Sequence, residues 1–270
     1  MAQPRYTVNC SILLTDLPLL ERPAAARAAG FDGVEFWWPF DTSTPDQGDV
    51  DEFTSAIAKA GVELTGLNFN AGNMPGGDRG LVSWPERSQE FRDNLDVVTA
   101  IGEQTGCRGF NALYGNRVAG VSPAEQDDLA VENLTLAADA VARIGGVVLV
   151  EPVSGTDSYP LKTAADAIGV IDRVERDNIG LLFDVYHLAV NGDDVEAARQ
   201  AYQDRIAHVQ IADAPGRDQP GTGQLPITRW IEDLYQGGYQ GWIGLEYKPA
   251  DEKSAADPFG WLAPEQRGSK

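Results

Sequence analysis

The sequence alternates short apolar runs, rich in β-branched residues, with longer stretches that have the spacing of amphipathic helices. Short runs of this kind predict buried strands, and the longer stretches predict helices that cover them. Eight such strands, each followed by a helical pattern, indicate a parallel α/β architecture. The expected strands cover residues 6–12, 33–37, 63–69, 107–113, 147–153, 179–185, 206–212 and 242–247.

Several of the helical stretches carry start and stop signals. Asp16 is expected to cap a first helix that Gly30 ends, and Gly61 ends the second. Ser122 and Glu125 have the spacing of a capping box, with a proline at the first helical position. The expected helices cover residues 16–29, 49–60, 85–105, 122–144, 163–176, 194–202 and 226–236.

A closed eight-stranded barrel and an open doubly wound sheet both fit this alternation. The barrel is favoured because polar residues stand at the C-terminal ends of several strands, where barrels place their active sites. A doubly wound nucleotide-binding sheet needs a glycine-rich turn after its first strand, and residues 9–16 contain no glycine. We therefore predict a single (β/α)8 TIM-barrel domain over residues 1–270. Residues 253–270 are expected to form a C-terminal tail that caps the barrel or a neighbouring subunit.

The charge of the chain limits its partners. It carries 41 acidic and 21 basic residues, a net charge of −20, which argues against nucleic acid or an anionic membrane surface as a partner. No apolar run approaches the roughly 20 residues that span a bilayer. The first residues lack the basic and then apolar layout of a signal peptide. We expect a cytoplasmic protein that acts on a small molecule.

Cysteine and histidine are scarce, which excludes some kinds of site. Cys10 and Cys107 stand next to strand-like sequence and are predicted to be small buried thiols. His187 and His208 are the two histidines, too few for a multi-zinc site of the histidine-rich kind. His208 lies one layer deeper in its strand than Gln210 and is predicted to be a core residue with a satisfied hydrogen bond.

Four oxygen-bearing side chains stand at the ends of four expected strands: Glu151, Asp184, Gln210 and Glu246. Each acid could instead cap the following helix or pair with a basic side chain. Three clustered carboxylates repel one another, and without a cation at least one of them takes up a proton. A divalent ion removes that conflict, and a ligand set made of oxygen alone favours Mg²⁺ or Mn²⁺ over zinc. The sequence therefore predicts a metal site at this end of the barrel.

A metal with open positions can chelate the carbonyl oxygen and the neighbouring hydroxyl of an α-hydroxy carbonyl compound and stabilise the enediolate formed when the carbon proton leaves. Glu151 and Glu246 are the longer acids of the set, so we expect them to transfer protons as well as to bind the metal. This chemistry is isomerisation or epimerisation.

Other side chains are candidates for substrate binding. Arg217 follows the strand of Gln210, and its planar fork suits a carboxylate. Lys248, two residues beyond Glu246, could do similar work, and the alternative for both cations is a surface ion pair. His187 is expected to orient the substrate or a metal-bound water. An apolar wall is expected from aromatic residues after the second and third strands, which ordinary core packing would explain equally well: Phe36, Trp37, Trp38 and Phe69.

In their residues and their order along the chain, these motifs resemble those of the hydroxypyruvate isomerase family, which belongs to the xylose isomerase-like TIM-barrel superfamily. The resemblance rests on segments 33–41, 150–152, 183–187, 208–213, 215–217, 220–223 and 244–249, and covers nearly the whole chain. It implies metal ligation by Glu151, Asp184, Gln210 and Glu246, with Glu151 and Glu246 as the acid/base pair. It also implies interconversion of hydroxypyruvate and tartronate semialdehyde.

The resemblance leaves alternatives open. Isomerases of 2-oxo-tetronate share the core motifs, and the loop over residues 70–80 is shorter than is usual in the family. Ketose 3-epimerases of the superfamily resemble this chain in their carboxylates but usually have histidine where this chain has Gln210. DNA-repair endonucleases of the superfamily are disfavoured by the two histidines and the net charge of −20. A non-catalytic alternative is a barrel that binds a sugar acid. A further possibility is that the glycines after the seventh strand bind the phosphate of a phosphorylated sugar substrate. The family resemblance is compatible with a homo-oligomer.

Overall fold

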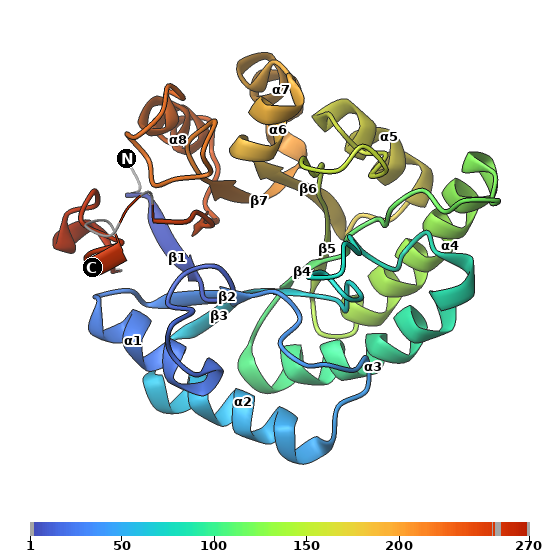
Figure 1. Ribbon diagram of the computed structural model, residues 1–270, viewed down its shortest axis with the longest axis horizontal. Coiled ribbons are helices and arrows are strands. Elements are labelled where there is room, and N and C mark those ends of the chain that lie inside the picture. Colours follow the sequence, from blue (N-terminus) through green and yellow to red (C-terminus); the bar gives the residue numbers. More distant parts are fainter. Residues whose placement is uncertain (1–2, 250, 252–254, 269–270) are drawn as a thin grey trace.

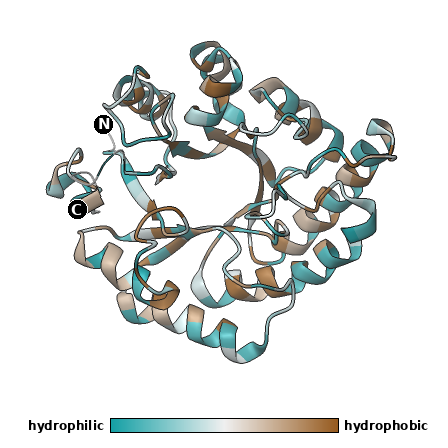
Figure 2. Cartoon of the chain, in the orientation of Figure 1, coloured by the Kyte–Doolittle hydropathy of each residue, from teal (hydrophilic) through white to brown (hydrophobic). Residues whose placement is uncertain are grey.

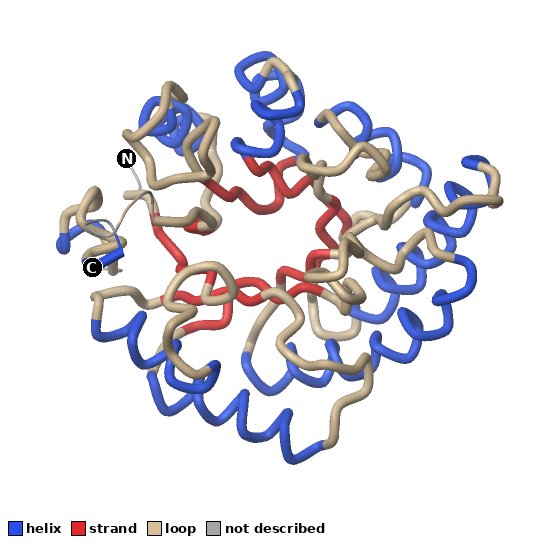
Figure 3. Tube along the Cα trace, viewed as in Figure 1, coloured by secondary structure: helices blue, strands red, loops and turns tan. Residues whose placement is uncertain are grey.

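In the computed structural model, eight parallel strands close into a barrel that is surrounded by helices, as the sequence predicts (Figures 1 and 3). The structure describes residues 3–249, 251 and 255–268. The strands are paired in chain order, and the last strand closes the barrel on the first. They are β1 (Arg5–Asn9), β2 (Gly33–Phe36), β3 (Glu63–Asn68), β4 (Gly109–Asn111), β5 (Val147–Val150), β6 (Ile179–Asp184), β7 (Ile206–Ile211) and β8 (Trp242–Leu245).

The strands are shorter than predicted at their C-terminal ends. The fourth was expected over seven residues, and β4 has three. Beyond Asn111 a single backbone hydrogen bond continues the pairing, from the amide of Ala112 to the carbonyl of Leu149. The apolar pattern runs past the ends of the strands because the first residues of the loops are buried as well, Ala112 completely so.

The helices lie outside the barrel, and Figure 2 shows hydrophobic residues along the strands and mixed hydropathy on the helices. The α-helices are α1 (Arg22–Ala28), α2 (Gln47–Ala60), α3 (Ser88–Thr105), α4 (Pro123–Ala142), α5 (Ala164–Val174), α6 (Val185–Asn191), α7 (Val195–Tyr202) and α8 (Ile227–Gln236). Short 3-10 turns are η1 (Leu19–Glu21), η2 (Pro85–Arg87), η3 (Gln203–Arg205) and η4 (Pro264–Gln266). None of the helices in the described ranges has the length and apolar character needed to cross a bilayer.

Two helix predictions need correction. The first helix begins at Arg22 and not at Asp16, because Pro18 disfavours helical conformation in the residue before it and the chain makes turns up to η1. The sequence did not predict α6, which is only seven residues long. The Asp184 side chain caps α6 by accepting hydrogen bonds from the amides of Tyr186 and His187, at 2.8 and 3.0 Å.

Other local predictions are confirmed. The Ser122 side chain accepts a hydrogen bond from the amide of Glu125 at the start of α4, at 3.2 Å. Cys10 and Cys107 are both buried and free. Burial raises the pKa of both thiols, so neither has the thiolate character of a reactive cysteine.

The described part of the tail packs on the protein's own barrel beside β1 (Figure 1). Phe259 packs against Phe31 with ring centroids 4.7 Å apart. Trp261 meets Tyr6 edge to face at 6.1 Å, and its indole donates to the Tyr247 hydroxyl at 2.8 Å. The described part of the tail therefore contributes to the core beside β1, while residues 253–254 and 269–270 of the predicted tail lie outside the described residues.

If the tail is part of the core, Phe259→Ala should lower the free energy of unfolding by about 3 to 5 kcal/mol, the cost of truncating a buried phenylalanine. Val190→Ala is the control: the side chain of Val190 is 44% exposed, and its truncation should change stability by about 0.5 kcal/mol at most. Urea denaturation followed by circular dichroism measures both. A Phe259 variant as stable as the control would show that the tail contributes nothing to the core.

Candidate active site

The four oxygen-bearing residues predicted from the strand ends meet at one end of the barrel. Asp184 of β6 pairs in register with Gln210 of β7, and Gln210 pairs with Gly244 of β8. Glu151 and Glu246 are the first residues after β5 and β8. One ligand atom from each of Glu151, Asp184, Glu246 and the neighbouring His187 lies within 4.8 Å of the others. All four side chains are buried, and together they could hold a metal ion.

Two of these carboxylates have one oxygen bound by the protein and the other directed at the cluster. Asp184 uses Oδ1 to cap α6, while its Oδ2 is buried without a hydrogen-bond partner in the described part of the chain. Glu151 Oε2 accepts a hydrogen bond of 2.7 Å from the amide of Asn111, and its Oε1 lies 3.8 Å from His187 Nε2. The protein therefore fixes the orientation of both groups.

Gln210 and Glu246 follow the same pattern. The Gln210 amide donates to Glu35 at 2.8 Å, and its Oε1 is buried and unpaired among the described residues. Glu246 Oε1 accepts hydrogen bonds from the indole of Trp37 at 2.6 Å and from Asn9 at 3.2 Å. Its Oε2 lies 3.0 Å from Arg217 Nη2, without hydrogen-bond geometry. Buried acceptors without donors are costly, and a cation among them would remove that cost.

Burial dominates the electrostatics of the cluster. It raises the pKa of Glu151, and the nearby charge of Asp184 raises it further. Burial also raises the pKa of Glu246, against the opposing effect of Arg217. Burial lowers the pKa of Arg217, but the charges of Glu246, Asp184 and Glu151 outweigh it and leave that pKa raised. Without a cation, burial therefore favours the protonated form of the Glu151 and Glu246 carboxyl groups.

His187 is held as a hydrogen-bond donor. The backbone amide of Ser154 donates to Nδ1 at 3.0 Å, so in the neutral ring the proton is on Nε2. Nε2 lies 3.8 Å from Glu151 and 3.9 Å from Asp184. Burial lowers the pKa of His187 to about 4, which keeps the ring neutral at physiological pH. An Nε2 that carries a proton cannot bind a metal, so in this tautomer His187 acts as a hydrogen-bond donor.

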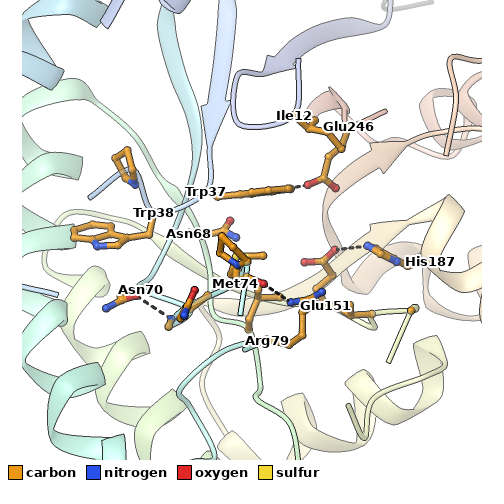
Figure 4. A pocket seen from close by; sticks show the side chains of 18 of the residues that line it. Ile12, Trp37, Trp38, Asn68, Asn70, Met74, Arg79, Glu151, His187 and Glu246 are labelled. Carbon is orange, nitrogen blue, oxygen red and sulfur yellow. Dashed lines mark hydrogen bonds and ion pairs between the residues drawn. The ribbon is translucent and has the colours of Figure 1, made fainter. Parts of the chain in front are cut away.

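A cavity of about 940 Å³ opens above the cluster (Figure 4). Its aromatic wall consists of Trp37, Trp38, Phe40 and Tyr186. The expectation that Phe36 and Phe69 line the cavity is wrong. Phe36 packs against Phe53 of α2 at 5.1 Å, and Phe69 against Phe91 of α3 at 5.4 Å and Phe110 of β4 at 6.2 Å. Side chains on a strand alternate, so the neighbour of Phe36 faces the cavity while Phe36 itself faces the helices.

Four cations line the cavity, and one of them, Arg87, is paired with Asp78 and Glu90. Arg217 is already engaged, because its Nη2 pairs with Glu246, its Nε donates to the Glu246 carbonyl at 3.3 Å, and its guanidinium lies 5.4 Å from the centre of the Tyr186 ring. Lys248 is exposed at the rim. Arg79 was not predicted. It donates to the carbonyls of Met74 and Asp78 and has no carboxylate partner within the described ranges.

The amide and acid residues that hold the cluster in place were not predicted from the sequence. Asn9 and Asn111 end β1 and β4, and Glu35 is the penultimate residue of β2. The signal that identified Glu151 and Asp184, a polar residue at the end of an apolar strand, was present in these three strands as well. His208, predicted to be a satisfied core residue, does have a partner: its Nε2 lies 2.7 Å from Glu35 Oε2.

Comparison with known proteins places these residues in a family context. Residues 23–265 match the family model of the xylose isomerase-like TIM barrel. A Streptomyces coelicolor protein named "Putative hydroxypyruvate isomerase" is 53% identical over 100% of this chain and 99% of its own length. A 2-oxo-tetronate isomerase of Cupriavidus necator is 33% identical over 97% of this chain and 98% of its own. The same two names recur in relatives from Escherichia coli and Haemophilus influenzae.

A solved structure supports the same fold. A Brucella melitensis protein described as AP endonuclease, family 2, superposes on this chain with a TM-score of 0.87 and 32% sequence identity. The match covers 97% of this chain and 98% of that one.

The ring of His187 should remain neutral, with its proton on Nε2, in the metal-free protein near pH 6. Long-range ¹H–¹⁵N NMR reports the tautomer, and His187→Asn identifies the signal. Because the folded pKa of about 4 lies below the ordinary 6.5, the unfolded state binds more protons between these values. The contribution of His187 to stability therefore falls as the pH drops through that window. Titration near pH 6.5, or a proton on Nδ1, would contradict this description of the site.

Proposed function

This chain belongs to the xylose isomerase-like TIM-barrel family, and we propose that it is a metal-dependent isomerase that interconverts hydroxypyruvate and tartronate semialdehyde. The names of its full-length relatives support an isomerase acting on a small hydroxy-ketoacid. The observation that carries the proposal is the set of buried oxygen atoms without donors, which converge below a cavity lined with cations.

The ion would be held by the oxygens that accept no hydrogen bond from the described residues, on Asp184, Gln210 and Glu246, together with Oε1 of Glu151. Of these, Glu246 Oε2 is also ion-paired with Arg217 at 3.0 Å. Four oxygen ligands, three of them carboxylates, suit Mg²⁺ or Mn²⁺. When bound, such an ion polarises the carbonyl and hydroxyl oxygens of the substrate and so makes the intervening carbon proton more acidic.

Glu151 and Glu246 are suited to move that proton. They come from strands on different sides of the barrel, and their carboxylates approach within 4.8 Å. One accepts a proton from the hydroxymethyl carbon, and the other delivers a proton to the former carbonyl carbon. The walls of Trp37 and Tyr186 keep water away from the reacting carbons.

Hydrogen-bond donors around the cluster would orient the substrate. His187 presents Nε2–H toward the carboxylates and can donate to a substrate oxygen. Arg217 lies beside Glu246, where its remaining nitrogen can bind the substrate carboxylate. Arg79 and Lys248 add positive charge at the cavity wall and rim. A substrate with a negative charge at one end fits this arrangement better than a neutral sugar does.

A four-carbon acid is the second candidate, because the cavity of about 940 Å³ is far larger than a three-carbon acid requires. The 2-oxo-tetronate isomerases among the relatives support it. The carbon chemistry is the same for both substrates, so only their relative rates distinguish them.

With Mn²⁺ or Mg²⁺ present, deuterium from D₂O should enter the reacting carbons of hydroxypyruvate, as followed by NMR. Glu246→Gln should slow this exchange by at least about 100-fold, because a proton-transfer group is lost. Glu63→Gln is the matched control: Glu63 begins β3 at the opposite end of the barrel, its side chain is 54% exposed, and exchange should be unchanged.

The outcomes separate the candidates. Faster exchange on a four-carbon 2-oxo acid than on hydroxypyruvate would keep the mechanism and change the substrate. No exchange on either acid by the metal-loaded protein would refute the proposed isomerisation, and exchange on neutral ketoses alone would indicate an epimerase.

Arg217 should determine the preference for an acid over a neutral substrate. Dihydroxyacetone has the same reacting carbons as hydroxypyruvate without the carboxylate, so the ratio of the two kcat/KM values cancels general damage to the site. Arg217→Ala should reduce this ratio by about 10- to 100-fold, the effect of one charge-assisted hydrogen bond. Arg229→Ala, at a guanidinium 67% exposed on α8, should leave it unchanged. An unaltered ratio in the Arg217 variant would mean that another cation binds the substrate carboxylate.

A further inference from the structure

A fourth buried carboxylate lies next to the three of the candidate metal site. Glu35 of β2 is 3% exposed and does not line the cavity. Its Oε2 lies 2.7 Å from His208 Nε2, and its Oε1 accepts hydrogen bonds from Gln210 at 2.8 Å and Asn9 at 3.1 Å. A carboxylate this deep requires donors, and both of its oxygens have them.

Glu35 determines which end of the Gln210 amide faces the metal site. A side-chain amide carries a donor nitrogen and an acceptor oxygen, and an ionised carboxylate only accepts. The nitrogen of Gln210 must therefore face Glu35, since the reverse orientation would set two oxygens against each other. This leaves Gln210 Oε1 on the opposite side, where it is buried and has no hydrogen-bond partner among the described residues.

Asn9 extends the same control to Glu246. Its Nδ2 contacts Glu35 Oε1 at 3.1 Å and Glu246 Oε1 at 3.2 Å, so it bridges the two carboxylates. The Asn9 oxygen is itself fixed, because it accepts a hydrogen bond of 3.0 Å from the amide of Ser11. With Oε1 of Glu246 held in this way, Oε2 is the oxygen that faces the cluster.

The barrel interior leaves room for this carboxylate. A Cβ atom on Gly244 of β8 would lie 2.7 and 2.9 Å from the two oxygens of Glu35 and 2.8 Å from Cγ of Gln210. Gly66 of β3 also faces Glu35, and a Cβ there would lie 3.3 Å from the Cβ of Glu35. TIM barrels usually fill such interior positions with branched apolar side chains. Here two strands have glycine beside a buried acid.

We propose that Glu35 is a positioning residue: it acts through Gln210 and, by way of Asn9, through Glu246 to present one oxygen of each to the metal ion. The proposal rests on the metal site of the proposed function. It assigns the buried carboxylate of Glu35 to ligand orientation, a role that differs from filling the barrel core.

The test uses Mn²⁺ alone, titrated into the metal-free protein by calorimetry. Glu35→Asp keeps the negative charge but shortens the side chain by one methylene, so the carboxylate no longer reaches the amide of Gln210. We expect Mn²⁺ affinity to fall about 10- to 100-fold, the usual effect of losing a hydrogen bond that orients a metal ligand. Glu63→Asp, the same change at an exposed glutamate, should bind Mn²⁺ as the unaltered protein does.

Glu35→Gln separates positioning from charge. It removes the charge but keeps the length of the side chain and one oxygen that can accept from Gln210. Positioning predicts that Glu35→Asp weakens binding at least as much as Glu35→Gln. If Glu35→Gln alone weakens binding, Glu35 acts only through its charge and the proposal is overturned.

Two further outcomes are decisive. If Glu35→Asp binds Mn²⁺ as tightly as the unaltered protein does, the proposal is overturned and the metal site is retained. If the unaltered protein binds no Mn²⁺, both the metal site and the proposal are overturned.

If near-UV circular dichroism shows that Glu35→Asp does not fold, Asn9→Ala is used for the test, because it removes the bridge to Glu246 and leaves every charge in place. It should lower Mn²⁺ affinity about tenfold, and unchanged affinity overturns the proposal.

Discussion

The crowding of buried oxygen acceptors at one end of the barrel is the constraint on which the rest of the site depends. Three carboxylates and a glutamine oxygen converge with little access to water, and burial raises the pKa of Glu151 and Glu246. The protein offsets part of this cost by binding one atom of each group with a donor or acceptor of its own. Ligand atoms of Glu151, Asp184 and Glu246 lie within 4.8 Å of one another, and a cation would satisfy them together.

The barrel supplies this arrangement because every strand has a polar side chain at its C-terminal end or within one residue of it. In chain order these are Asn9, Glu35, Asn68, Asn111, Glu151, Asp184, Gln210 and Glu246. Because all eight strands are parallel, these side chains lie at the same end of the barrel. Four are amides and four are acids, so the ring contains donors for its own carboxylates. Asn9 and Asn111 donate to Glu246 and Glu151 in this way.

The sequence was sufficient for the barrel and for the members of the acidic cluster. The alternation of apolar and amphipathic stretches predicts the strands and helices directly. An acid at the end of an apolar strand is easily recognised because its neighbours are apolar. It was not sufficient for the orientation of each group. Whether Phe36 or Trp37 faces the cavity depends on one residue of strand register, and the proton position on His187 depends on Ser154, which is 33 residues away in the chain.

Tertiary context also determined the roles of the cations and the extent of α6. Arg217 was predicted as a free fork for a carboxylate, but the fold places it against Glu246 and Tyr186. Arg79 lines the cavity because of the conformation of the loop that carries it, and no local sequence pattern predicts that conformation. The seven residues of α6 are too few for a helical period, and their cap is Asp184, a residue already assigned to another role.

The most direct test of the central claim is a crystal structure of the protein with Mn²⁺, with anomalous scattering recorded to locate the ion. We predict one ion bound by Glu151, Asp184, Gln210 and Glu246, with Nε2 of His187 outside the coordination sphere and Glu35 still accepting from the Gln210 amide. Coordination by His187 in place of Gln210, or an ion bound elsewhere, would contradict the claim that the unpaired oxygens of this ring form the metal site.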